Sequence, residues 1–227
     1  MGLCVFDLDH TLIRTPLDLA AMAVDMRALI ERARGPLPPR PGRWRVGELV
    51  AWSKERAPEL EPAVWEVALD HERRAMDAAS LEPGALEAVT GARGGGLRTA
   101  LWTNNARAIT APALERLGLA ALLDLVVTRD DMSALKPDPD GWRVISKHFA
   151  ARLGGVTASA RAAMRAVVVG DSWVDGLAAA AAGVPFVAYR AREADLARWG
   201  VRPVAHLAEL AALPAWLAEH FNGRGAA

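Results

Sequence analysis

The sequence contains one cysteine, carries no net charge and has no long uninterrupted apolar run. A single cysteine, Cys4, excludes an internal disulfide, and the default interpretation of this residue is a small buried hydrophobe. With 27 basic and 27 acidic residues, the chain offers no overall electrostatic attraction to nucleic acid or to a membrane surface. Any anion that it binds must therefore be held by local groups.

The longest apolar stretch, residues 177–189, is interrupted by Gly183 and Pro185 and is too short to span a bilayer. The amino terminus lacks a basic region and reaches Asp7 too early for a signal peptide. Together with the scarcity of cysteine, this predicts a soluble protein in a reducing, cytoplasmic location, with no membrane and no nucleic-acid partner. The sequence carries no signal for oligomeric state.

Five short apolar runs bounded by polar turns predict buried parallel strands. They cover residues 3–6, 97–102, 123–127, 166–169 and 185–189. Helical spacing over residues 106–117, 140–153 and 173–182 predicts crossover helices between the later strands, and residues 207–221 predict a further helix interrupted by Pro214. The pattern indicates an α/β fold, a doubly wound parallel sheet of Rossmann-like type.

About 90 residues separate the first predicted strand from the second, whereas an ordinary crossover needs only about a dozen. Helical spacing over residues 17–33, 46–56 and 62–79 predicts that this interval is a small all-helical domain. We assign residues 15–82 to it and residues 1–14 and 83–227 to the α/β core. Three tryptophans of the insert are expected to pack in its own core: Trp44, Trp52 and Trp65.

The first predicted strand runs directly into Asp7, Asp9 and Thr11. Alternation of side chains places both aspartates on one face at the carboxyl end of the strand, where open parallel sheets bind ligands. Two carboxylates about 4 Å apart repel by about 4 kcal/mol at an effective dielectric near 20. A divalent cation or a shared proton would offset this repulsion. The alternative is a strand that ends in a polar turn.

The second predicted strand ends in Thr103, Asn104 and Asn105 just before a predicted helix. Such a turn offers a hydroxyl, free backbone N–H groups and the positive end of a helix dipole, which suit a phosphate or carboxylate oxygen. The alternative is an ordinary helix cap at Asn104 or Asn105.

Lys136 follows the third strand and stands beside Pro137, with Pro139 close behind, so its ammonium is expected to be held as a compact charge for an anion. The alternative is a solvated loop lysine.

After the fourth strand, Asp171 and Asp175 are expected near one face of a helix start, where they repel unless a cation lies close.

Ser172 and Asp175 also have the spacing of a capping box, which would explain the pair without a metal. However, all four polar sites follow successive strands, and that edge is where ligands bind in this architecture. Together they supply hard oxygen ligands for a magnesium-sized ion, a lysine, anion donors and a spare carboxylate for proton transfer. This inventory indicates phosphoryl chemistry.

On these motifs the chain resembles the haloacid dehalogenase-like hydrolase superfamily, in its phosphatase branch of the phosphoglycolate-phosphatase-like type. The residues that carry the resemblance are Asp7-Leu8-Asp9-His10-Thr11, Thr103, Lys136, and Gly170-Asp171 with Asp175. The resemblance extends from residue 2 to about residue 189. The insert resembles the family's helical cap domain by position and helicity only.

The resemblance implies a role for each motif residue. Asp7 would be the nucleophile that forms an aspartyl-phosphate, and Asp9 would be the general acid and base. Mg2+ would be bound by Asp7, the backbone carbonyl of Asp9 and Asp171, with Asp175 supporting the site. Phosphate would be held by Thr103 and the backbone at Asn104, while Lys136 balances the negative charge.

The implied activity is Mg2+-dependent hydrolysis of a phosphomonoester of a small metabolite. Dehalogenases of this superfamily lack an acid at the position of Asp9, so Asp9 favours the phosphatase. A phosphomutase of the same superfamily and a non-catalytic, phosphate-binding regulatory module are the alternatives. Phosphoglycolate, sugar phosphates and nucleoside monophosphates all remain open as substrates.

The chain departs from the resemblance at His10, where glycine is common. A tolerated turn residue with positive φ is the favoured interpretation of His10, and a substrate contact is the other. Arg14 and the basic loop of residues 34–45 are candidate anion contacts or solvated charges.

Overall fold

The computed structural model describes residues 2–151 and 165–222. Its contacts divide the chain into two compact units, residues 1–14 with 80–227, and residues 15–79. The predicted helix over residues 140–153 extends two residues beyond the described part. Within the described ranges, no helix has the length and apolar character needed to cross a membrane.

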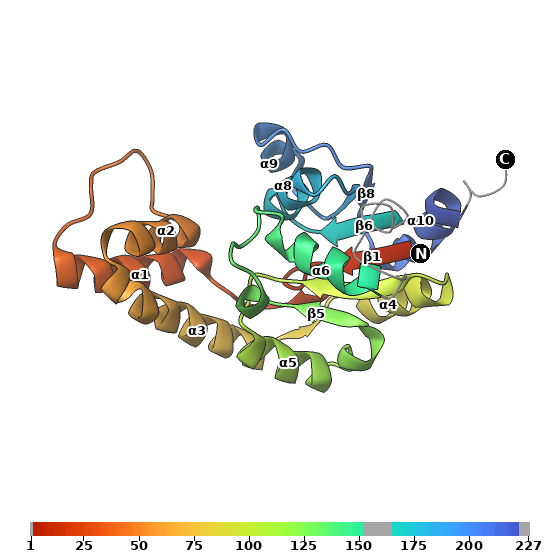
Figure 1. Cartoon of the computed structure of the whole chain (residues 1–227), viewed down its shortest axis with the longest axis horizontal. Coiled ribbons are helices and arrows are strands. Elements are labelled where there is room, and N and C mark those ends of the chain that lie inside the picture. Colours follow the sequence, from red (N-terminus) through yellow and green to blue (C-terminus); the bar gives the residue numbers. More distant parts are fainter. Residues whose placement is uncertain (1, 152–164, 223–227) are drawn as a thin grey trace. The chain divides into compact units, whose positions relative to one another are not determined.

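The larger unit is built on a six-stranded sheet in the order β5-β4-β1-β6-β7-β8, in which every neighbouring pair is parallel (Figure 1). The strands are β1 (Gly2–Phe6), β4 (Arg98–Trp102), β5 (Leu125–Val127), β6 (Arg165–Gly170), β7 (Phe186–Tyr189) and β8 (Ala205–Leu207). The first five confirm the predicted strands. Sequence reasoning missed β8 because this three-residue edge strand is only partly buried and has no apolar run.

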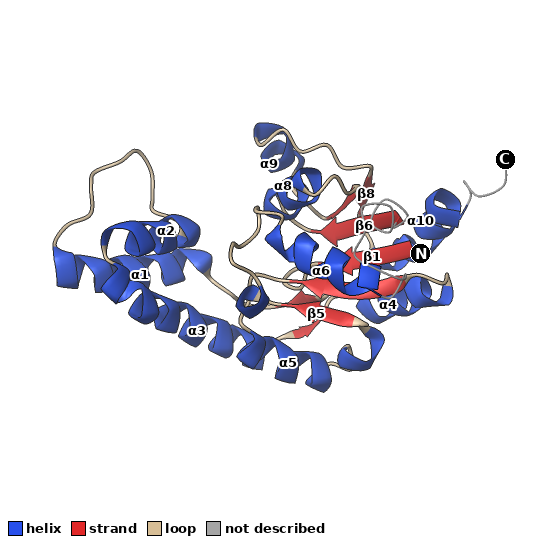
Figure 2. Ribbon diagram, viewed as in Figure 1, coloured by secondary structure: helices blue, strands red, loops and turns tan. Residues whose placement is uncertain are grey.

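Helices cover both faces of this sheet (Figure 2). One face carries α6 (Asp140–Ala151), α8 (Trp173–Ala181) and α9 (Glu193–Arg198), and the other carries α4 (Ala85–Gly94), α5 (Arg107–Arg116) and α10 (Leu213–Leu217). Leu3 and Val5 belong to the core beneath α6 and α8, while Cys4 and Phe6 point the opposite way and are also fully buried. Burial on both faces explains why these strands are uniformly apolar.

The carboxyl-terminal helix was predicted wrongly at its start. Leu207 ends strand β8, and α10 begins only at Leu213. Pro214 lies in the first turn of α10, where a missing backbone N–H removes no helical hydrogen bond. The proline therefore begins this helix rather than interrupting it.

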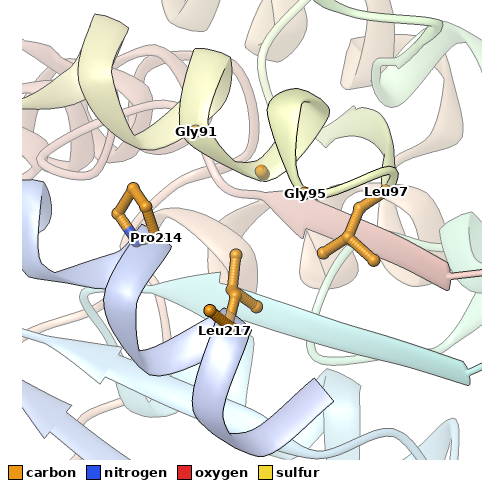
Figure 3. A pocket seen from close by; sticks show the side chains of 7 residues that line it. Gly91, Gly95, Leu97, Pro214 and Leu217 are labelled. Atoms are coloured by element: carbon orange, nitrogen blue, oxygen red, sulfur yellow. The ribbon is translucent and has the colours of Figure 1, made fainter. Parts of the chain in front are cut away.

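Helix α10 packs closely on α4. A Cβ atom at Gly91 would lie 2.4 Å from Cγ of Pro214, so only glycine permits this approach. A small apolar hollow lies beside the contact, between Gly91, Leu97 and Leu217 (Figure 3). Leu97 precedes β4, which places the hollow at the amino end of that strand, away from the carboxyl edge that the sequence motifs single out.

The smaller unit consists of three helices, α1 (Leu19–Arg34), α2 (Val46–Arg56) and α3 (Glu61–Asp77), joined by a short 3-10 turn between the second and third. Their apolar faces meet around Met26, Ile30 and Leu49. Trp44, Trp52 and Trp65 pack against this cluster, which confirms the prediction that they serve the core of the insert.

The chain leaves and re-enters the larger unit through a two-stranded antiparallel ribbon of β2 (Ile13–Arg14) and β3 (Ser80–Leu81). Glu82 follows this ribbon with a side chain that is only 4% exposed. Its Oε1 accepts hydrogen bonds from the Tyr189 hydroxyl at 2.6 Å and from Arg190 at 2.8 Å, and its Oε2 accepts from Nε of Arg14 at 2.6 Å. One carboxylate thus joins the ribbon to the end of β7.

Glu82→Gln is expected to lower the free energy of unfolding by about 1–3 kcal/mol at neutral pH, because the amide removes the charge that both arginines share. Burial alone raises the pKa of Glu82, but hydrogen bonds from Arg14 and Tyr189 outweigh it and lower the pKa below its ordinary value. The stabilisation should therefore be present at neutral pH and be lost as the pH falls through that lowered pKa. Urea unfolding at several pH values measures it, with the exposed Glu87→Gln as a matched control; equal stability of the two variants at pH 7 would contradict the assignment.

Candidate active site

The predicted site residues follow four adjacent strands at one edge of the sheet. Asp7 comes directly after β1, Thr103 after β4, Lys136 in the turn region beyond β5, and Asp171 after β6. The pairing of the strands continues into the site, because the Asp7 N–H donates to the carbonyl of Val169 at 2.9 Å. The parallel register therefore brings these residues together.

The Lys136 ammonium is at the centre of the site and is buried rather than solvated, so the loop-lysine alternative is wrong. Its Nζ donates to Oδ1 of Asp7 at 2.5 Å, to Oδ1 of Asp175 at 2.6 Å and to the carbonyl of Trp102 at 2.9 Å. These three bonds use all the N–H groups of an ammonium. The charge is consequently held in one place.

Asp175 serves both as a helix cap and as an ion-pair partner. Its Oδ2 accepts from the Ser172 N–H at 3.2 Å, and its own N–H donates to Oγ of Ser172 at 3.4 Å, which together form the predicted capping box. The Ser172 hydroxyl also donates to Oδ2 of Asp175 at 2.6 Å. Its Oδ1 simultaneously binds Lys136. A Cβ at Gly170 would lie 2.6 Å from that of Asp175, so glycine is needed at the end of β6.

Three carboxylates gather around the single ammonium. Asp7, Asp171 and Asp175 each offer an oxygen, and these oxygens lie within 4.8 Å of one another. Burial, and then the charge of Asp175, raise the pKa of both Asp7 and Asp171 above the ordinary value. Burial by itself would lower the pKa of Lys136, but Asp175 and Asp7 raise it, so the lysine stays charged.

This cluster fits a divalent cation such as Mg2+. One positive charge faces three carboxylates, so negative charge remains in excess, and all the donor atoms are hard oxygens. Asp171 is partly exposed, which leaves the cluster accessible. The predicted ligands Asp7 and Asp171 are brought together here, with Asp175 beside them.

The two asparagines after β4 do not cap α5, so that alternative is wrong: the cap residue is Ala106, which has no side-chain cap bond. Asn104 instead pairs with the backbone of Lys136. Its Oδ1 accepts from the Lys136 N–H at 2.9 Å, and its Nδ2 donates to the Lys136 carbonyl at 3.1 Å. The Asn104 side chain thus fixes the lysine, while contact of its backbone with phosphate stays a prediction.

Two further side chains, Thr11 and Asn105, belong to the site through partners that the sequence did not indicate. Thr11 donates to Oδ2 of Asp7 at 3.3 Å, and Asn105 donates through Nδ2 to Oδ2 of Asp9 at 2.6 Å. Thr11 belongs to the motif of residues 7–11, so the sequence placed it near the site. Its hydrogen bond to Asp7 could be found only in the structure. Thr103 is buried and accepts the Asn105 N–H at 3.1 Å, which leaves its hydroxyl hydrogen to donate to a ligand.

His10 and Arg14 lie outside the acidic cluster. His10 is exposed and has a φ of 57°, as the turn-residue interpretation requires. The guanidinium of Arg14 binds Glu82, and in the basic loop Arg34 and Arg40 pair with Glu59 and Glu48. A role for His10 or Arg14 in substrate binding stays a prediction.

Known proteins share sequence and fold with this chain. The family model described as haloacid dehalogenase-like hydrolase matches residues 1–183. A phosphoglycolate phosphatase of Agrobacterium fabrum is 27% identical over 99% of this chain and 96% of its own length, and one of Caulobacter vibrioides is 31% identical over 80% and 76%. The crystal structure of a hydrolase from Pseudomonas syringae has the same fold, with a TM-score of 0.65, 21% identity and coverage of 98% of this chain and 99% of that one.

Proposed function

The chain belongs to the haloacid dehalogenase-like hydrolase family and is a phosphatase, and we propose that it hydrolyses a small phosphorylated metabolite with Mg2+ through an aspartyl-phosphate. The observation that carries the proposal is the position of Asp7. It lies at the end of β1 with Oδ1 2.5 Å from Nζ of Lys136, beside Asp171 and Asp175.

In the first half of the proposed reaction, a carboxylate oxygen of Asp7 attacks phosphorus and forms a new P–O bond. The bond from phosphorus to the leaving oxygen breaks, and its electron pair stays on that oxygen. Asp9 transfers its proton to the oxygen, so the leaving group departs as an alcohol and Asp9 becomes a carboxylate.

In the second half, Asp9 accepts a proton from water as the water oxygen attacks the phosphorus of the aspartyl-phosphate. The P–O bond to Asp7 breaks, which releases inorganic phosphate and regenerates the Asp7 carboxylate. Thr103 supplies a hydrogen-bond donor to the phosphate, and Lys136 supplies positive charge. Mg2+, held by Asp7, Asp171 and the backbone carbonyl of Asp9, would neutralise negative charge on the phosphoryl oxygens.

We propose 2-phosphoglycolate as the first substrate to examine, because the relatives described above are named phosphoglycolate phosphatases. The helical unit of residues 15–79 is proposed to be the cap domain that selects the substrate. The same assay includes a sugar phosphate and a nucleoside monophosphate, which the sequence left open.

With Mg2+ present, the protein is expected to release phosphate from p-nitrophenyl phosphate and, with the highest kcat/KM, from 2-phosphoglycolate. A chelator should reduce this rate by at least about a hundredfold, because three carboxylates and one ammonium repel a phosphate dianion. Addition of excess Mg2+ should restore the rate. The measurement is colorimetric phosphate release under steady-state conditions.

Three outcomes distinguish the alternatives. Activity that persists in chelator would overturn the metal requirement. Isomerisation of the sugar phosphate without free phosphate would favour a phosphomutase. Tight binding of a phosphorylated ligand without turnover would favour a regulatory module.

A further inference from the structure

The consecutive asparagines after β4 serve two different residues of the site. Asn104 binds the backbone of Lys136 through both atoms of its amide, whereas Asn105 reaches the carboxyl of Asp9. The distance from Nδ2 of Asn105 to Oδ2 of Asp9 is 2.6 Å, and Asn105 is only 6% exposed. A buried amide is therefore aimed at the proposed proton donor.

Asn105 is itself held firmly. Its backbone N–H donates to Oγ1 of Thr103 at 3.1 Å, and its carbonyl accepts from the N–H of Arg129 at 3.1 Å. Both contacts lie at the end of the sheet, so the amide of Asn105 projects from a rigid support. A side chain supported in this way can fix the orientation of its partner.

We infer that Asn105 is a positioning residue for Asp9, an inference that rests on the proposed function. An amide N–H can only donate, so Oδ2 of Asp9 must accept this bond. Asn105 thereby fixes the orientation of the Asp9 carboxyl group.

This hydrogen bond is not needed to close the turn that contains Asp9. The turn that contains Asp9 is already closed by its own backbone, because the N–H groups of Leu12 and Ile13 both donate to the carbonyl of Leu8, at 2.9 and 3.0 Å. The N–H of His10 also donates to the carbonyl of Ile13 at 2.7 Å. Asn105 contacts the carboxyl group and not this backbone.

The experiment compares Asn105→Ala with wild type on two esters whose leaving groups differ in basicity. An alkyl phosphate such as 2-phosphoglycolate needs a proton on its leaving oxygen, whereas p-nitrophenolate leaves readily without one. The rate compared is that of leaving-group release in a single turnover, because hydrolysis of the aspartyl-phosphate is common to both esters and also uses Asp9. We expect this rate to fall by about ten- to a hundredfold for the alkyl ester and by less than about threefold for p-nitrophenyl phosphate. In an Asp9→Asn background, Asn105→Ala should cause no further loss for either ester.

Arg107→Gln is the control, because Arg107 lies two residues along the same segment and binds Asp131 rather than Asp9. It should leave the ratio of the two rates unchanged. If Asn105→Ala does not fold, Asn105→Ser carries the same expectation. An equal loss in the single-turnover rate of leaving-group release on both esters, or a loss that adds to that of Asp9→Asn, would overturn the positioning role.

The two proposals fail in different ways. Wild-type protein that releases phosphate from neither ester would contradict the proposed function itself. Normal wild-type turnover that requires Asp7, combined with an unchanged rate ratio in Asn105→Ala, would contradict only the role of Asn105.

Discussion

Asp7→Asn is expected to abolish phosphate release, with kcat falling by at least about a thousandfold. An amide has no anionic oxygen with which to attack phosphorus, so the aspartyl-phosphate cannot form. The substitution is nearly isosteric and removes one of three mutually repelling carboxylates, so the fold should be retained. Steady-state phosphate release from p-nitrophenyl phosphate in Mg2+ measures the loss.

A matched control is Asp195→Asn on α9, where the carboxylate pairs at the surface with Arg192. This variant should turn over at the wild-type rate, and urea unfolding should show that both variants are folded. Turnover by Asp7→Asn within about tenfold of wild type would exclude Asp7 as the nucleophile.

Lys136→Met is expected to lower the free energy of unfolding by about 3–5 kcal/mol and to abolish activity. The lysine side chain is 4% exposed and donates to Asp7, Asp175 and the carbonyl of Trp102. Methionine keeps most of the volume but leaves two buried carboxylates without their positive partner. Removal of one member of a buried ion pair is costly for that reason, even where the intact pair adds little.

Urea unfolding of the two proteins at pH 7 in the presence of chelator measures this effect. Lys147→Met on the exposed face of α6 is the control, and its stability should lie within about 0.5 kcal/mol of wild type. If Lys136→Met were as stable as this control, the ammonium would not be what offsets the repulsion between the carboxylates.

The central sheet could be predicted because its strands are buried on both faces and therefore read as short apolar runs, such as the run that ends at Phe6. The short elements could not be predicted in this way. Strands β2, β3 and β8 contain two or three residues each and have no periodic signal. Pro214 was misread because the same residue either starts or interrupts a helix, and only the packing of α10 on α4 decides which.

Side-chain partners were also beyond the reach of the sequence. Ser172 and Asp175 are three residues apart, so their capping box was visible in the local spacing. Asn105 and Asp9 are separated by 96 positions, and Glu82 lies 107 positions from Tyr189. No local pattern indicates such pairs, because they form only when strand ends from distant parts of the chain meet.

The order of amino acids is enough to show which chemical groups stand at the strand ends: carboxylates after β1 and β6, a hydroxyl after β4 and a lysine beyond β5. It could do so because the alternation between apolar runs and polar turns is a property of neighbouring residues. The tertiary structure alone decided how these groups are paired, with one ammonium among three carboxylates and a separate asparagine for Lys136 and for Asp9. Those pairings depend on the parallel register, which brings the strand ends together. They also depend on burial, which lowers the effective dielectric and so strengthens each electrostatic contact.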